Sequence, residues 1–227
     1  MCKYVRSLLC IVVIVLALFL SCSVFAATPN LLKNPSFEEA DKGKLPIAWE
    51  INAQEKNGTI AFGVSDEKAL SGKYSGKVQV KVIDPNAKAN KLEAIYCQNV
   101  SVQDNKLYKL TFNYNRDNIK TVMPFIIFLD SDGERITSID DASIYSCSTL
   151  ETDLSWEVVA NNGALRLSDN ISKDLEWIER WIVVKPPKGT SEIAVWINAK
   201  GGTVDLSRSG SLYWDDLSMI QFVDTTL

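Results

Sequence analysis

Two adjacent carboxylates, Asp215 and Asp216, interrupt an apolar and aromatic stretch near the C-terminus, "GSLYWDDLSMI". The stretch has the composition of a β-strand, in which successive side chains point to opposite faces. This alternation predicts that Asp215 shares the core face with Tyr213, Leu217 and Met219. A carboxylate on a core face must be neutralised, hydrogen-bonded or bound to a cation, because burial of a bare charge is very costly.

The absence of histidine narrows the chemistry further. It excludes nucleophiles activated by histidine and every zinc site that needs imidazole, which leaves carboxylate chemistry, Lys or Tyr bases, or an oxygen-ligated metal. A glycoside hydrolase needs two carboxyl groups across the scissile bond. The nearest pattern is "ETDLSWE" at 151–157, and its spacing differs from the E-x-D-x-E arrangement that β-sandwich glucanases often carry on one strand. A hydrolase or lyase is therefore the less favoured alternative, and we expect no enzymatic activity.

The N-terminus has the pattern of a secretory signal peptide: two basic residues, an apolar run over 8–20, and then small residues. We expect cleavage after Ala26, with Ala27 as the second choice, and a secreted, periplasmic or cell-surface protein. A lipoprotein anchored at Cys22 is less favoured, because Phe19 stands where such sites usually carry leucine. The apolar run is too short to favour a membrane span.

The charge balance is acidic. The whole chain has a formal net charge of −4, and the predicted signal peptide carries two of the 24 basic residues and none of the 28 acidic ones. An acidic chain favours neither nucleic acid nor anionic lipid as a partner. The remaining residues, 27–227, suffice for one sizeable core, so we expect a single domain and a monomer.

Cys97 and Cys147 are the two cysteines that remain after removal of the signal peptide. In an oxidising compartment they could form one disulfide bond. Two unpaired buried thiols agree equally well with the sequence.

Eight apolar stretches with strand composition are separated by turn residues, and no long segment keeps a helical period. These stretches predict an all-β fold, an antiparallel β-sandwich. The "DSDG" of 130–133 is predicted to be a hairpin turn, since it lacks the other acidic positions of a calcium loop. The segment 131–176 is predicted to hold extra hairpins and a long loop, either shaping a binding edge or merely connecting strands. The predicted strands are 59–65, 75–83, 94–102, 107–115, 123–130, 177–185, 192–199 and 210–220.

Several motifs occur in the same order as in carbohydrate-binding modules of the family 4/9 type, which the chain resembles. They are "NLLKNPSFEEADKGKLPIAWE", "ALSGKYSGKVQV", "LYKLTFNYN", "WIERWIVVKPPKG" and "GSLYWDDLSM". The resemblance implies a jelly-roll sandwich of the galactose-binding type and a polysaccharide or oligosaccharide ligand. The segment 131–176 is longer than in the usual module, and the sequence shows no attached catalytic domain.

The resemblance also implies a structural calcium ion. Carried over to this sequence, its ligands are the carboxylates of Glu38 and Asp215 and the backbone carbonyls of Ser71 and Tyr74. Calcium takes six to eight oxygen ligands in flexible geometry, so this ligand set suits it. The alternative is a metal-free Asp215 that accepts hydrogen bonds from backbone amides and from Lys73 or Arg208.

Aromatic rings are the residues that would bind a sugar, because they offer flat platforms to its apolar C–H faces. In "EIAVWINA" the alternation directs Trp196 and Asn198 away from the core, and in "LYKLTFNYN" it directs Asn113 outward. The candidate carbohydrate-binding residues are Trp49, Tyr96, Asn113, Trp181 and Trp196, of which Tyr96 is the weakest because its alternation favours the core. The same rings would also suit a protein partner in an adhesion or assembly module.

Overall fold

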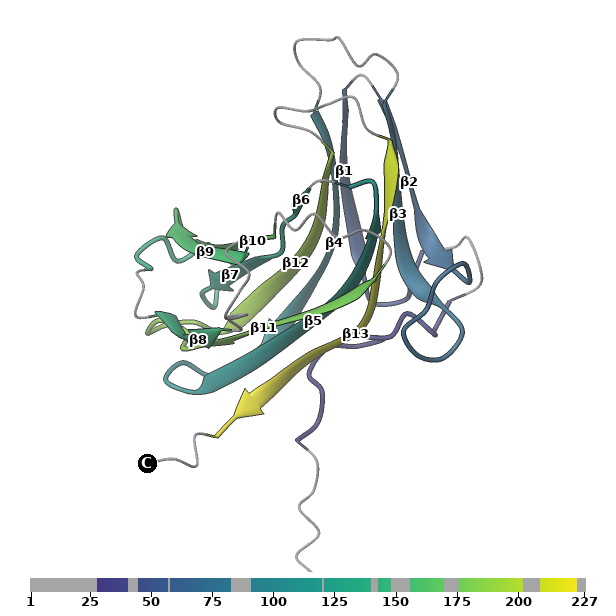
Figure 1. Ribbon diagram of the computed structural model, residues 1–227. Coiled ribbons are helices and arrows are strands. Elements are labelled where there is room, and N and C mark those ends of the chain that lie inside the picture. Colours follow the sequence, from purple (N-terminus) through teal and green to yellow (C-terminus); the bar gives the residue numbers. More distant parts are fainter. Residues whose placement is uncertain are drawn as a thin grey trace, which may run out of the picture.

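The computed structural model describes residues 28–40, 45–56, 58–82, 91–119, 121–139, 143–147, 156–169, 176–201 and 209–223. Within these residues the chain forms strands and turns and contains no α-helix, so no described helix could cross a membrane. The predicted signal peptide, its cleavage site and Cys22 lie outside the described residues. The strands form two antiparallel sheets, which confirms the predicted fold class (Figure 1).

Seven strands form the first sheet, which we call sheet A. Their spatial order is β1 (Glu50–Lys56), β4 (Lys91–Ser101), β12 (Glu192–Gly201), β6 (Thr121–Val122), β10 (Ala164–Asp169) and β7 (Phe125–Leu129), with β9 (Trp156–Asn161) paired to β10. Strand β7 also pairs directly with β12.

Six strands form the second sheet, sheet B. Their order is β2 (Gly58–Ser65), β3 (Ser75–Val82), β13 (Gly210–Phe222), β5 (Leu107–Asp117), β11 (Trp177–Val184) and β8 (Ile144–Cys147). Strands β8 and β9 both lie at the left of Figure 1, away from β2 and β3.

The hydrophobic core lies between the two sheets and follows the alternation of the strands. Along β12, the inward side chains of Ile193, Val195 and Ile197 are all 0% exposed. Inward residues of β5 are buried in the same way, among them Leu110 and Phe112. Burial of large apolar side chains from both layers is the main term that holds such a sandwich together.

Each of the eight predicted strands is present, with ends that differ by a few residues. The sequence did not predict β1, whose residues "EINAQEK" are mostly polar. The "DSDG" segment forms the predicted turn: Gly133 donates its backbone N–H to the carbonyl of Asp130 at 3.2 Å.

The segment 131–176 supplies strands to both sheets. It forms β8, at the edge of sheet B, and the hairpin of β9 and β10 in sheet A. The hairpin turn is Asn162–Gly163, with φ of 46° and 75°, as a two-residue type I′ turn requires. The predicted extra hairpin is therefore confirmed, while residues 148–155 and 170–175 lie outside the described part.

The two cysteines are unpaired in the structure, so the disulfide alternative is wrong here. Cys97 lies on β4 of sheet A, in register with Trp196. Cys147 lies on β8 of sheet B and packs against the core. The two thiols therefore belong to different layers, and burial raises the pKa of both.

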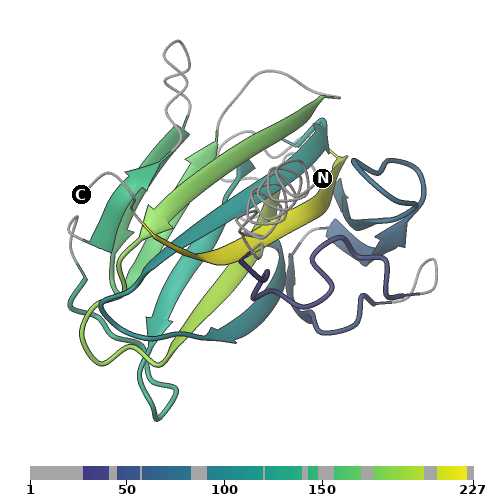
Figure 2. The ribbon, with the colours of Figure 1, turned by 90° about the horizontal axis from the view of Figure 1, so that it is seen from below.

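The N-terminal segment 28–40 is fixed against the last strand. Leu31 donates its backbone N–H to the carbonyl of Met219, and Leu217 donates to that of Pro35, at 2.7 and 3.1 Å. Figure 2 shows this segment, in purple, running from the yellow β13 toward β2 and β3.

Candidate functional site

A bulge in β13 explains how the strand accommodates its two carboxylates. Asp215 is in register with Asn113 of β5 but Ser218 with Thr111, so β13 contains one extra residue. Asp216, with φ of 45°, is at this irregularity. The predicted core face is therefore wrong for Tyr213 and Asp215 and right for Leu217 and Met219. Tyr213 and Asp215 face away from the core on sheet B, whereas Leu217 and Met219 return to the core.

Asp215 is nonetheless fully buried, because the loop 66–74 covers it. Its Oδ2 accepts the backbone N–H groups of Leu70 and Ser71 at 2.7 and 3.2 Å, and its Oδ1 accepts that of Asp216 at 2.8 Å. The carboxylate thus holds the middle of the loop to the final strand.

Glu38 holds the last two residues of the same loop. Its Oε1 accepts the backbone N–H groups of Lys73 and Tyr74 at 2.8 and 2.7 Å. Gly72 has φ of 60°, and a Cβ atom at this position would collide with the Glu38 carboxylate. The loop can therefore approach Glu38 closely only with glycine at 72.

The implied calcium ligands lie close to one loop, but their geometry does not fit a calcium cage. The loop directs amide hydrogens at Asp215 and Glu38, and such hydrogens would repel a cation. Ser71 and Tyr74 make these contacts through N–H groups, although the resemblance implies carbonyl ligands. Within the described residues no group of three or more Cys, Asp or Glu side chains could hold a metal. The arrangement resembles the metal-free alternative, although Lys73 contacts Glu38 instead, and Arg208 lies outside the described residues.

Calcium is therefore expected to leave the melting temperature of the protein unchanged. An ion that binds only the native state must stabilise it, so a binding site would show as a rise in melting temperature. Calorimetry in calcium, in magnesium and in a chelator would check this result. A rise specific to calcium and reversed by the chelator would contradict it.

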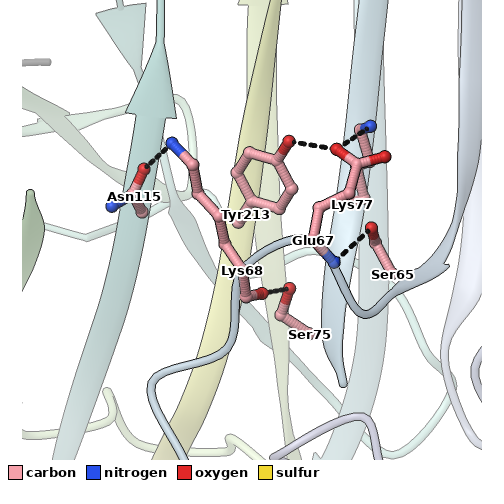
Figure 3. A network of polar contacts seen from close by, with 7 residues as sticks. All are labelled: Ser65, Glu67, Lys68, Ser75, Lys77, Asn115 and Tyr213. Atoms are coloured by element: carbon pink, nitrogen blue, oxygen red, sulfur yellow. Dashed lines mark hydrogen bonds and ion pairs between the residues drawn. The ribbon is translucent and has the colours of Figure 1, made fainter. Parts of the chain in front are cut away.

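The outer face of sheet B is partly closed by polar contacts to the loop 66–74 (Figure 3). Lys68 donates from Nζ to Oδ1 of Asn115 at 3.0 Å, and the hydroxyl of Tyr213 donates to Oε2 of Glu67 at 2.8 Å. Lys77 pairs with the same Glu67 oxygen at 2.6 Å. These contacts place the loop over β13 and β5.

Four of the five predicted carbohydrate-binding residues do not come together in a common cleft. They are Trp49, Tyr96, Asn113 and Trp181. Asn113 is 8% exposed beneath the loop 66–74, and its Nδ2 donates to the carbonyl of Asp216, so its predicted place in a cleft is wrong. Trp181 is half-buried on the outer face of sheet B, with Nζ of Lys109 5.0 Å from its ring centroid.

Trp49 and Tyr96 are core residues, and their predicted role as sugar platforms is wrong. Trp49 is 5% exposed, stacks on Phe37 at 5.4 Å and donates from Nε1 to the carbonyl of Asn34. Tyr96 is 0% exposed, and its hydroxyl donates to the carbonyl of Lys77 at 2.8 Å. Trp49 thus packs against the N-terminal segment, and Tyr96 joins sheet A to Lys77 of sheet B.

Trp196 is the predicted residue that does lie in a suitable cleft. It faces outward from β12, as the alternation predicts, and is half-buried. Trp196 is in register with Phe125 of the neighbouring strand β7, and the two rings meet edge to face with centroids 6.4 Å apart. This aromatic pair forms a partly exposed apolar surface on the outer face of sheet A.

The pair stands beside a small apolar cluster and a cleft. Ile127, Ala164 and Ala194 form the buried part of the cluster, against which the two rings pack. The cleft has a volume of about 260 Å³. Its lining residues are Met123, Phe125, Ile127, Arg135, Asn162, Ala164, Arg166 and Trp196.

Polar groups with unused hydrogen-bonding capacity lie on the same face. The Nε of Arg166 is buried and has no partner among the described residues. Asn198, two positions beyond Trp196 on β12, is 0% exposed and donates to Oε1 of Glu93 at 2.7 Å, while its own Oδ1 accepts no hydrogen bond from the part of the chain that the structure describes. Buried polar atoms are nearly always satisfied, so such atoms indicate a missing ligand or water.

Two larger hollows lack these features. One, of about 520 Å³, is lined by residues of the N-terminal segment, β1 and β4, and its described lining includes no aromatic ring. The other, of about 500 Å³ on sheet B, also has no aromatic ring among its described lining residues. The cleft beside Trp196 is therefore the candidate site, which we call the Trp196 cleft.

Sequence reasoning missed Phe125, Arg135 and Arg166 as site residues. Phe125 lies in the uniformly apolar "MPFIIFLD", where alternation gives no signal. The two arginines come from the segment 131–176, whose strand pairing could not be predicted. The acidic pattern "ETDLSWE" contributes no described side chain.

Comparison with known proteins supports the fold. No protein-family model and no curated protein matches the chain. The enzymatically active domain of tailspike protein 4 of bacteriophage CBA120 is 15% identical, with a TM-score of 0.55 over 85% of this chain and 21% of that one. A structure of promiscuous carbohydrate-binding modules of the β-sandwich superfamily is 16% identical, with a TM-score of 0.50 over 86% and 64% of the two chains. A cyclase from Fischerella sp. TAU, solved with an indolyl butanone, is 12% identical, with a TM-score of 0.50 over 86% and 98%. The chain thus shares a jelly-roll β-sandwich fold with binding modules and with enzymes.

Proposed function

We propose that this protein is a secreted, non-catalytic carbohydrate-binding β-sandwich that docks a polysaccharide or oligosaccharide in the Trp196 cleft. The observation that carries the proposal is the half-buried pair of Trp196 and Phe125 beside that cleft. Aromatic faces match the apolar C–H faces of sugar rings, and nearby polar groups can hold the hydroxyls.

Two further observations support this proposal. The fold is shared with carbohydrate-binding modules, although a shared fold alone does not establish a function. The described residues that line the cleft include no carboxylate, whereas hydrolysis of a glycoside needs two carboxyl groups placed across the bond. Binding without cleavage is therefore the activity that the described residues favour.

Affinity electrophoresis would test the proposal. Native gels that contain one polysaccharide each, from neutral glucans, xylans and mannans to acidic polymers, would be compared with a gel without polysaccharide. We expect retardation by one class of glycan and no release of reducing ends or unsaturated products. Migration at the control rate in every gel would contradict the proposal and favour a protein-binding sandwich.

A further inference from the structure

The Trp196 cleft is positively charged, although the protein as a whole is acidic. Arg135 and Arg166 line it, and none of the other described lining residues is Asp or Glu. The formal net charge of the whole chain is −4. Two guanidinium groups at an aromatic cleft on an acidic protein form a local site rather than part of a generally basic surface.

Arg166 belongs to a row that crosses three strands. It is in register with Phe125, which is in register with Trp196. Neighbouring strands lie about 4.8 Å apart, so the backbone of Arg166 lies about that distance beyond the backbone of Phe125. Leu165 and Leu167, on either side of Arg166, are 0% exposed in the core, which fixes Arg166 on the outer face.

Burial leaves Arg166 with a donor to satisfy. Its Nε is shielded from solvent and has no hydrogen-bond partner in the described residues. An unpaired donor on a permanently charged group is costly, and an anionic acceptor would relieve this cost best. The position therefore favours a ligand with negative charge.

Arg135 is held at the rim of the same cleft by the β9–β10 turn. Its Nη1 donates to the carbonyl of Asn162 at 3.4 Å. A side chain at Gly163 would meet the aliphatic part of Arg135 and the carbonyl of Ile136, so the turn packs tightly against this arm. The turn thus holds a second guanidinium side chain in the lining of the same cleft.

The carboxylates described on this face of sheet A lie elsewhere. Glu93 accepts a hydrogen bond from Asn198, and Glu192 accepts one from Asn99 at 3.2 Å. Glu50 is in register with Cys97, on the far side of β4 from the cleft. None of the three is among the described residues that line the cleft. Glu157 of β9 is in register with Ser168, two positions beyond Arg166, and its side chain lies outside the described part of the structure.

We propose that the Trp196 cleft binds an acidic saccharide, whose anionic group is held by Arg166 and Arg135 while a sugar ring packs on Trp196 and Phe125. The planar guanidinium can donate two parallel hydrogen bonds to a carboxylate, so a uronate fits this chemistry, and a sulfate ester shares it. This inference rests on the proposed function and specifies its class of ligand.

The test compares one polymer in two forms. Polygalacturonate and the same polymer with its carboxyl groups reduced to alcohols would be placed in native gels with a chelator, beside a sulfated galactan. Wild-type protein, Arg166→Gln and Lys81→Gln would be run together. Lys81 is exposed at the hollow on sheet B, so its substitution changes the net charge equally at a different place.

We expect at least tenfold weaker binding when the carboxyl groups are reduced, and the same loss for Arg166→Gln on the acidic polymer. Arg166→Gln should bind the reduced polymer as the wild type does, while Lys81→Gln should bind normally. Retention by the sulfated galactan alone would keep the proposal and assign a sulfate ester as the anion.

Three results would overturn the inference. Equal or tighter binding of the neutral polymer would show that the arginines do not select charge. Equal losses for Arg166→Gln and Lys81→Gln would show general electrostatic attraction. Binding of none of the polymers in this test or in the wider panel would overturn the proposed function itself, which separates the two failures.

Discussion

Replacing Trp196 by alanine is expected to abolish retardation in the gel that retards the wild type. A central aromatic platform typically contributes about 2–4 kcal/mol to binding, which corresponds to a loss of roughly 30-fold or more. The ring is half-buried on the outer face, so its removal leaves the core between the sheets intact. Titration calorimetry with an oligosaccharide of the retarding glycan would measure the loss, and circular dichroism would check the fold.

Trp181→Ala is the matched control for this substitution. Trp181 is also a half-buried tryptophan on an outer sheet face, but it lies on sheet B beside Lys109. We expect its substitution to leave the affinity unchanged. Equal affinities of wild type and Trp196→Ala would remove the Trp196 cleft from the binding function.

Replacing Asp215 by alanine should cause the largest loss of stability among substitutions outside the core. The carboxylate accepts three backbone N–H groups, those of Leu70, Ser71 and Asp216, at a fully buried position. A buried donor left without a partner costs about 1–3 kcal/mol, and partial access of water would reduce the sum. We expect the free energy of unfolding in urea to fall by about 3 kcal/mol.

The loss should also depend on pH. Burial raises the pKa of Asp215 from 3.8 to about 6, because it outweighs the three N–H bonds that lower it. The folded state therefore binds more protons than the unfolded state between these values, and the contribution of Asp215 to stability falls as the pH rises through about 6. The difference between wild type and Asp215→Ala should be larger at pH 4 than at pH 8, and a difference independent of pH would contradict the shift.

Asp216→Asn is the control for the second carboxylate. Asp216 has φ of 45°, a conformation that asparagine also adopts readily. Its Oδ1 accepts the hydroxyl hydrogen of Ser71 at 2.8 Å, and an amide oxygen can replace this acceptor. A small change in unfolding free energy is therefore expected, so a loss as large as that of Asp215→Ala would indicate that the bulge itself has been disturbed.

The sequence predicted the strands better than their faces. Alternation in "EIAVWINA" correctly separated Ile193, Val195 and Ile197 from Trp196, because β12 is regular over these residues. The same rule placed Leu217 and Met219 correctly but failed for Tyr213 and Asp215, since the bulge between them adds one residue that no composition reveals. Strand β1 was missed because its side chains carry little apolar signal.

The candidate site was predictable only in part, for a physical reason. Whether a side chain faces outward is a local property of its strand, and it identified Trp196. Which outward side chains become neighbours depends on cross-strand register, and the pairings that bring Phe125 and Arg166 beside Trp196 join strands distant in sequence. Trp49 and Tyr96 were misplaced because exposure depends on what the N-terminal segment covers.

The extra residue at the Asp216 bulge changes which side chains of β13 face the core. Before it, odd-numbered positions face the loop 66–74, and after it, odd-numbered positions such as Leu217 and Met219 face the core. The odd-numbered residues of one strand thus face a polar surface before the bulge and the apolar interior after it. Loss of a single residue here would restore the regular phase and turn one half of the strand inside out, so this short stretch should tolerate substitutions far better than insertions or deletions.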